Sequence, residues 1–247
     1  TTRDGEAGKR ITFKASGVVK TKGFNINNAY TTVDGFTVVP RNSIIITKSN
    51  VDVLNNHCID SFIRINYNSN VTNCLIKGNH VESSYPWGND WPAIEIWGSN
   101  NIAEYNEVGP STDADAFRTF GHDNIIRNNY IHDITHSPGS KAHTDIFQTF
   151  GVRRWEVARD IVFENNLILN NDAQLFMTSC SGDTAIHDFD VRNNVIVNMK
   201  YQGNVGIPNL RFYNNTCINV DPTNGFALYI HEVPKVLDPT GCQVFNN

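Results

Sequence analysis

The sequence predicts an all-β solenoid, in which short strands stack coil upon coil, and two observations support this. First, a motif marked by Asn recurs along the chain, at intervals of 23, 27, 23, 37, 28, 21 and 32 residues. Second, the residues around each motif alternate between apolar and polar, which is the periodicity of a strand and not of a helix. Repeats of this size bury their apolar faces only by stacking on one another.

Each repeat is expected to contain a short strand, a bend and a second short strand. The anchor residues of the bends are Asn56, Asn79, Asn106, Asn129, Asn166, Asn194, Asn215 and Asn247. Apolar residues stand three positions before the anchors, as at Val53 and Ile126, and two positions after most of them, as at Val81 and Ile168. Asn tolerates left-handed backbone angles, and stacked Asn side chains can hydrogen-bond along a ladder.

The coils resemble those of a known superfamily. Residues 11–247 include segments such as DIVFENNLILNN, DFDVRNNVIVN and NLRFYNNTCIN, which are similar to coils of the pectate-lyase-like proteins. The resemblance implies a single-stranded right-handed parallel β-helix of roughly eight to nine coils. That superfamily includes polysaccharide lyases, hydrolases, epimerases, phage tailspikes and non-catalytic proteins. The sequence lacks the catalytic motifs of polygalacturonases, mannuronan epimerases and pectate lyases, so no catalytic family within it is matched.

Because one repeat runs from end to end, residues 1–247 are expected to form a single domain. The last repeat stops on its bend at Asn247, so we expect a missing C-terminal segment, or another subunit of a homo-oligomer, to cover that end. The alternative is an end that simply frays. The formal net charge of −5 argues against a nucleic-acid partner. No apolar run is long enough to span a membrane. With the resemblance, these features predict an extracellular protein that is secreted or belongs to a cell surface or virion.

A second alignment locates a candidate site. The segments 93–98, 116–121 and 146–151 read AIEIWG, AFRTFG and IFQTFG and align without gaps. Their inward positions are Ile94, Phe117 and Phe147, and their outward positions are Glu95, Arg118 and Gln148. The next outward column, Trp97, Phe120 and Phe150, is predicted to be either an aromatic strip for stacking on sugar rings or a patch covered by a loop.

Extending this alignment towards the N-terminus puts Asp115 beside Asp145 and Asp113 beside His143. Neighbouring coils are about 4.8 Å apart, and residues i and i+2 of a strand are about 6.6 Å apart, so these four would form a rectangle on one outer face. The alternative is a run of polar residues at solvated strand starts. The predicted catalytic residues are Asp113, Asp115, Arg118, Lys141, His143 and Asp145.

This cluster is compatible with two reactions. A pair of carboxylates is the requirement of a glycoside hydrolase. For β-elimination on a uronate, a Ca²⁺ ion held by Asp113, Asp115 and Asp145, or Arg118 directly, would neutralise the substrate carboxylate. His143 or Lys141 would then be the base. The segment HTDIFQ resembles a His-x-Asp-x-x-Gln pattern of pectate-lyase-like polysaccharide enzymes, which supports the location more than the mechanism.

The sequence therefore predicts a protein that processes an acidic polysaccharide, with a lyase favoured over a hydrolase. The alternative is a non-catalytic glycan-binding or structural solenoid, such as a tailspike or adhesin segment. The histidines His57 and His80 stand in one column and are expected to be solvated residues of the ladder rather than ligands. The predicted substrate-binding residues are Asp90, Trp91, Glu95, Trp97, Phe120, His122, Gln148, Phe150, Arg153 and Arg154.

Overall fold

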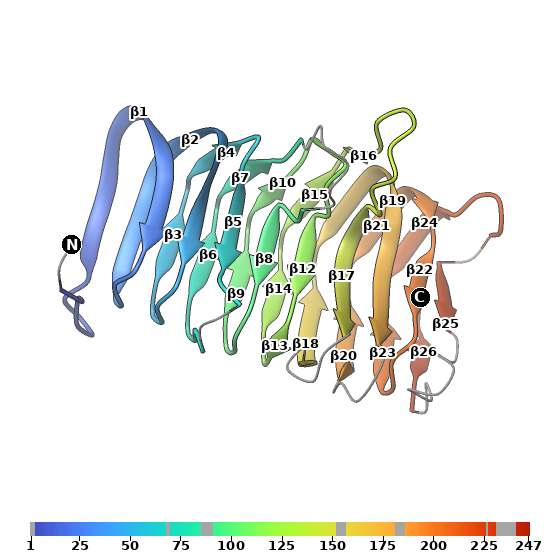
Figure 1. The fold of residues 1–247 in the computed structure, drawn as a ribbon. Helices are drawn as coiled ribbons and strands as arrows, with labels where there is room; N and C mark the ends of the chain where they lie inside the picture. The colour runs from blue at the N-terminus through green and yellow to red at the C-terminus, as the bar shows by residue number, and fades with distance from the viewer. Residues whose placement is uncertain are drawn as a thin grey trace.

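The computed structural model describes residues 3–67, 70–84, 91–151, 157–180, 186–225, 227–230 and 241–247. Within these ranges the regular elements are all strands, so no described segment is a helix capable of crossing a membrane. The strands stack coil upon coil from the N-terminal end of the chain to the C-terminal end (Figure 1). Neighbouring strands of successive coils pair in parallel, as β12 (Phe117–Thr119) does with β17 (Asp145–Gly151). The predicted all-β solenoid is confirmed.

Three columns of parallel strands make up the walls. The first contains β1 (Ile11–Ile26), β2 (Thr31–Ile46), β3 (Asp52–Leu54), β6 (Leu75–Lys77), β9 (Ile102–Glu104), β14 (Ile125–Arg127), β18 (Ala158–Glu164), β20 (Ile186–Arg192), β23 (Leu210–Tyr213) and β26 (Gln243–Phe245). The second continues from β1 and β2 through β4 (His57–Ile59), β7 (His80–Glu82), β10 (Glu107–Val108), β15 (Tyr130–His132), β19 (Leu167–Cys180), β21 (Val195–Tyr201) and β24 (Thr216–Val220). The third runs from β1 and β2 through β5 (Phe62–Ile65), β8 (Ile94–Ile96), β12, β17, the end of β19, β22 (Gly203–Val205) and β25 (Leu228–Ile230).

The remaining strands lie at the corners. Strand β13 (Gly121–His122) pairs with the start of β18, and β11 (Ser111–Thr112) pairs with β16 (Ile134–Thr135). The second column contains nine described strand segments, in β1, β2, β4, β7, β10, β15, β19, β21 and β24. This number agrees with the expected eight to nine coils.

The anchor asparagines line up inside the bend between the first and second columns. In each pair of neighbouring coils, the side-chain amide of one donates to the amide oxygen of the next, as Asn106 Nδ2 does to Asn129 Oδ1 at 3.0 Å. The same oxygen accepts the backbone N–H of Asn106 at 2.9 Å. This pattern repeats from Asn56 to Asn247. The side chains thus satisfy backbone groups that the bend would otherwise bury without partners.

The residue before each anchor adopts the left-handed backbone conformation that turns the chain. Asn128 has φ of 56°, and the equivalent Asn165 and Asn193 have φ of 55° and 57°. Asn is among the few non-glycine residues that occupy this left-handed region readily. In the Asn-Asn pairs, therefore, the first residue turns the chain and the second bonds the coils together.

The core runs along the axis of the solenoid. The predicted inward residues Ile94, Phe117 and Phe147 are fully buried or nearly so. Phe147 of the third column contacts Phe163 of the first, with ring centroids 5.7 Å apart and an interplanar angle of 75°. Such contacts between walls hold each strand at a fixed height and orientation, so the polar residues on the outer faces have defined positions.

Candidate functional site

The two carboxylates Asp115 and Asp145 lie on adjacent coils of the third column. The backbone N–H of Asp145 donates to Asp115 Oδ1 at 2.9 Å, and the N–H of Ala116 donates to the carbonyl oxygen of Asp145 at 2.8 Å. The structure therefore brings these two residues together, as the gap-free alignment predicted. Both side chains are fully buried, however, and do not lie on an open outer face.

Asp145 is the centre of a hydrogen-bonded triad. Its Oδ2 accepts from His143 Nδ1 at 2.8 Å and from Gln148 Nε2 at 2.9 Å. The His143 side chain is 52% exposed, whereas Asp145 is fully buried. The triad accounts physically for the His-x-Asp-x-x-Gln spacing, because the strand and the residues preceding it bring both donors to one carboxylate oxygen. The buried carboxylate holds the orientation of the exposed imidazole, as in a catalytic His–Asp pair.

The Arg118 guanidinium supplies positive charge to this buried group. Its Nη2 donates to Asp115 Oδ2 at 2.6 Å, and its side chain is 14% exposed. The guanidinium carbon also lies 5.5 Å from the centroid of the Phe150 ring. Arg118 is thus committed largely to Asp115 and not to an external anion, which differs from its predicted role of binding the substrate carboxylate directly.

Burial dominates the electrostatics of the pair. Desolvation raises the pKa of Asp115 well above its ordinary value, and it also raises the pKa of Asp145. Arg118 opposes the shift at Asp115, and the bond from His143 opposes it at Asp145. Among the described residues, Asp145 Oδ1 has no hydrogen-bond partner. Two adjacent buried carboxylates with raised pKa values favour a state in which the pair keeps a proton.

Asp113 lies elsewhere, which corrects the predicted rectangle. Its Oδ1 accepts from the Ser137 backbone N–H at 3.1 Å, its Oδ2 accepts from the Ser137 hydroxyl, and its φ is 57°. Burial raises its pKa, but the bonds from Ser137 and Ser140 outweigh this, so the pKa is lowered. The prediction that Asp113 lies beside His143 is therefore wrong.

The physical reason is an insertion. Ser111 pairs with Ile134, an offset of 134 − 111 = 23 residues, whereas Phe117 pairs with Phe147, an offset of 147 − 117 = 30 residues. The later coil therefore has seven additional residues between the position of Ser111 and that of Phe117. The gap-free alignment was extended across this insertion, so it paired Asp113 with the wrong residue. Asp113 consequently faces the turn that contains Ser137.

This donor set does not fit the predicted calcium ion. Asp113 is bonded to Ser137 in another turn, and Asp115 and Asp145 are buried beside the Arg118 guanidinium. Calcium needs six to eight oxygen ligands, which the two remaining carboxylates do not supply. Among the described residues, His57, His80 and Glu82 form a group of three potential metal ligands, and their ligand atoms all lie within 4.8 Å of one another.

The aromatic column exists, but only part of it reaches solvent. Trp97 and Phe120 stack with centroids 3.9 Å apart and an interplanar angle of 19°, and Phe120 meets Phe150 edge-on at 5.3 Å. Phe120 is buried, while Trp97 and Phe150 are partly exposed. The prediction that Phe120 contacts a sugar ring is therefore wrong, since its neighbours cover it and it serves to pack Trp97 in place.

A second cluster surrounds Glu95. Its carboxylate forms an ion pair with Arg64 and accepts from Trp97 Nε1 at 2.9 Å. The Arg64 guanidinium lies 4.5 Å from the Trp91 ring centroid and 4.8 Å from that of Phe62. Glu95 is buried by these contacts, so it orients Arg64 and Trp97 and is not itself an exposed acid.

Other predicted residues lie around these clusters. His122 Nδ1 bonds Asp123 Oδ2 at 2.6 Å at the corner that follows the third column. Lys141 is exposed two residues before His143. The predicted substrate contacts Asp90, Arg153 and Arg154 lie outside the described residues.

A groove of about 340 Å³ opens beside His143. It is lined by His136, Ala142, His143, Thr144, Gln174, Tyr201, Gln202 and Asn204. Asn204 Oδ1 is buried without a hydrogen-bond partner among the described residues, which suits it to accept from a ligand hydroxyl.

The part of this groove that comes from the next two coils was not predicted from the sequence. In the ladder, Asp145 pairs with Gln174, and Gln174 pairs with Tyr201. Extending the column that contains Asp145 by two further coils would have identified Gln174 and Tyr201.

The chain's sequence matches no protein-family model and no curated protein. Among solved structures, it is similar to a mutant tailspike protein of E. coli bacteriophage HK620 in complex with a pentasaccharide, with a TM-score of 0.48 and 9% identity over 96% of this chain and 57% of that one. A GH87 α-1,3-glucanase catalytic domain in complex with nigerose has a TM-score of 0.32 and 13% identity over 94% of this chain and 65% of that one. The chain thus spans less than two thirds of either structure. The parallel strand register within the chain itself defines the class as a parallel β-helix.

Proposed function

We propose that this protein cleaves an acidic polysaccharide by β-elimination, with His143 as the base. The observation that carries the proposal is the triad in which Asp145 Oδ2 accepts from both His143 Nδ1 and Gln148 Nε2 at the edge of the groove. With Nδ1 in this bond, we assign the uptake of the substrate proton to Nε2, at the other side of the ring.

Burial of the carboxylates favours elimination over hydrolysis. A glycoside hydrolase needs two carboxyl groups in contact with the glycosidic bond, one on each side. Asp115 and Asp145 are fully buried and bonded to protein groups, so neither is placed to touch a sugar. The exposed proton-transfer group of this cluster is an imidazole, which suits removal of a proton from carbon.

The proposed step balances as follows. His143 Nε2 takes the C5 proton of a uronate residue, and the electrons of that C–H bond form the C4=C5 double bond. The C4–O4 bond breaks, and the leaving oxygen receives a proton from an acid in the groove. Tyr201 lines the groove, and its hydroxyl is the acid we assign. The exposed Lys141 ammonium would offset the charge of the substrate carboxylate, which stabilises the carbanion-like transition state.

The neighbouring side chains fit a sugar polymer. Asn204 and Gln202 offer amide groups to hydroxyls in the groove. Trp91 and Trp97, both partly exposed, offer ring faces on the preceding coils of the same column. A polymeric substrate also implies an extracellular site of action, which stays a prediction, as do the single domain and the homo-oligomer.

The test is the appearance of unsaturated uronate ends, followed by ultraviolet absorbance, on a panel of acidic and neutral polysaccharides. We expect product from one acidic polymer with the unmodified protein and none with His143→Ala. Asp145→Asn should lower kcat by at least about a hundredfold, because general acid–base catalysis contributes that much or more. The matched control is His187→Asn, which removes a half-buried histidine bonded to Asp188 on another column. Equal activity of His143→Ala and the unmodified protein would refute the assignment.

The second candidate is glycan binding without turnover, and the partly exposed Trp91 supports it. Trp91 packs against Phe62 at 5.6 Å and carries the Arg64 guanidinium on its ring, which makes a rigid aromatic surface. Binding of a polysaccharide that persists in His143→Ala, is lost in Trp91→Ala, and yields no product with any polymer would establish this function instead.

A further inference from the structure

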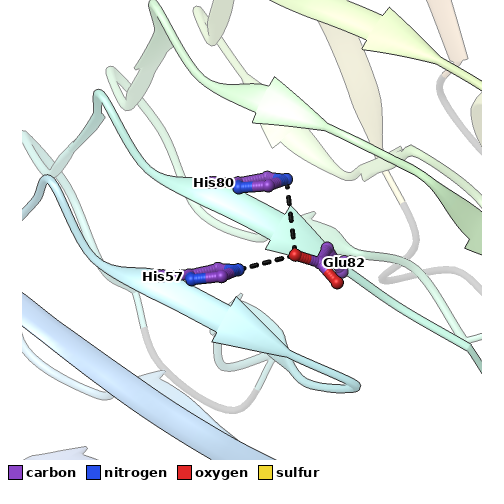
Figure 2. A group of neighbouring side chains, drawn as sticks. All are labelled: His57, His80 and Glu82. Atoms are coloured by element: carbon purple, nitrogen blue, oxygen red, sulfur yellow. Dashed lines mark hydrogen bonds and ion pairs between the residues drawn. The ribbon is translucent and has the colours of Figure 1, made fainter.

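A second side-chain cluster lies on the second column, several coils before the groove. It consists of His57 from β4 and His80 and Glu82 from β7 (Figure 2). The two strands pair in parallel, with His57 opposite His80 and Ile59 opposite Glu82. Cys58 and Val81 between them are fully buried in the core, so the backbone that carries the cluster is firmly held.

The two imidazoles stack and point the same nitrogen at one carboxylate oxygen. Their ring centroids are 4.6 Å apart and the rings are parallel to within 1°. His57 Nε2 lies 2.6 Å from Glu82 Oε1, and His80 Nε2 lies 3.6 Å from the same atom. Figure 2 shows both rings directed at Glu82, and the three candidate ligand atoms all lie within 4.8 Å of one another.

We propose that His57, His80 and Glu82 bind a divalent transition-metal ion of the zinc class. Two imidazole nitrogens and one carboxylate oxygen are a ligand set that zinc uses, whereas calcium and magnesium take oxygen ligands. Ligand atoms on a tetrahedral zinc ion are about 3.3 Å apart, given metal–ligand distances of about 2.0 to 2.1 Å. The separations of 2.6 and 3.6 Å to Glu82 Oε1 bracket that value.

Small side-chain rotations complete the geometry. The χ2 angle of histidine has a broad range, so each ring can tilt towards a common point without moving its strand. His80 Nε2 would exchange its 3.0 Å contact with the carbonyl oxygen of Gly109 for the metal. The side chains of His57, His80 and Glu82 are 40%, 33% and 30% exposed, so an ion has access from solvent.

Two other potential ligands, Glu107 and Cys58, lie close to the proposed metal site. Glu107 Oε1 lies 3.9 Å from His80 Nε2, and it could occupy the fourth position in place of water. The Cys58 thiol is not a ligand, because it faces the core and burial raises its pKa to about 12. Since the ligands come from neighbouring coils, the ion would link one coil to the next and stabilise their stacking.

The test is calorimetric titration of chelator-washed, tag-free protein with zinc chloride. We expect one ion per chain with a dissociation constant in the micromolar range, and a higher melting temperature with zinc. His57→Asn, His80→Asn and Glu82→Gln should each weaken binding by about tenfold or more. The control His187→Asn, which removes a similarly exposed histidine beside Asp188, should bind as the unmodified protein does. No saturable binding at millimolar zinc, or unchanged affinity in the three variants, would overturn the proposal.

A second measurement does not depend on the variants. X-ray absorption of the zinc-loaded, unmodified protein should show two imidazole nitrogens and oxygen ligands around the metal. A shell of oxygen alone, or one that contains sulfur, would also overturn the proposal. Calcium chloride should give no comparable heat, and equal affinity for calcium would contradict the assigned ligand class.

Discussion

Replacing Asn129 by alanine should destabilise the coil stack far more than its small size suggests. The Asn129 amide donates to Asn166 Oδ1 at 3.0 Å and to the carbonyl oxygen of Ala103 at 3.1 Å. Its oxygen accepts the side-chain amide of Asn106 at 3.0 Å and the backbone N–H of Asn106 at 2.9 Å. Alanine removes all four bonds and leaves the buried backbone N–H of Asn106 without its acceptor.

The magnitude follows from these four contacts. A buried donor left without a partner costs about 1–3 kcal/mol, and each lost bond costs about 1 kcal/mol net. Three lost bonds at about 1 kcal/mol each and one donor without an acceptor at about 1–3 kcal/mol give about 4–6 kcal/mol, so we expect Asn129→Ala to lower the free energy of unfolding by that amount. This is a large share of the roughly 5–15 kcal/mol typical of a domain. The adjacent change Asn128→Gly should alter it by less than about 0.5 kcal/mol, because glycine readily adopts the φ of 56° found there.

The two variants are compared by urea unfolding and by native-state hydrogen exchange. Because coils of a solenoid can unfold in parts, exchange at the Asn106 amide is the more direct measurement. It should lose protection in Asn129→Ala and keep it in Asn128→Gly. A loss of less than about 1 kcal/mol in Asn129→Ala, or an equal loss in both variants, would refute the role given to the stacked amides.

Three further outcomes are expected. The raised pKa of Asp145 means that the folded chain keeps this proton at a pH where the unfolded carboxyl, with its ordinary value of 3.8, has lost it. Stability should therefore fall as pH rises from about 4 towards the folded-state pKa, and Asp145→Asn should flatten this slope in pH-dependent melting curves. Phe120→Ala should cost about 3–5 kcal/mol in denaturant unfolding and loosen Trp97, because Phe120 is buried against it. The Cys58 and Cys74 thiols, whose pKa values burial raises to about 12, should resist alkylation at neutral pH until the chain is unfolded. Rapid labelling of the native protein would contradict their burial.

Repeats made the fold predictable, because each coil has the same alternation of apolar and polar residues around an Asn-marked bend. Any single strand of three residues, such as β4 or β7, is too short to recognise alone. Eight aligned bends, however, reveal which residues share a column and which face the core. The same register placed Asp115 beside Asp145 correctly, since no insertion separates the residues used in that alignment.

The errors arose where a coil changes length or where side chains cover one another. Seven extra residues after Thr135 moved Asp113 away from His143, and a gap-free alignment contains no sign of them. Phe120 stands in an outward column but is buried between Trp97 and Phe150. Neither insertion length nor mutual burial follows from alternating polarity alone.

Period-two alternation and a recurring bend were enough to predict an all-β solenoid from the sequence, and the register of its strands wherever coils keep their length. The polar groups that meet became known from the three-dimensional structure. His143, Asp145 and Gln148 form a triad because the strand geometry brings both donors to Asp145 Oδ2. His57 and His80 converge with Glu82 because β4 pairs with β7, and such convergence depends on distances of a few ångströms that residue order does not contain.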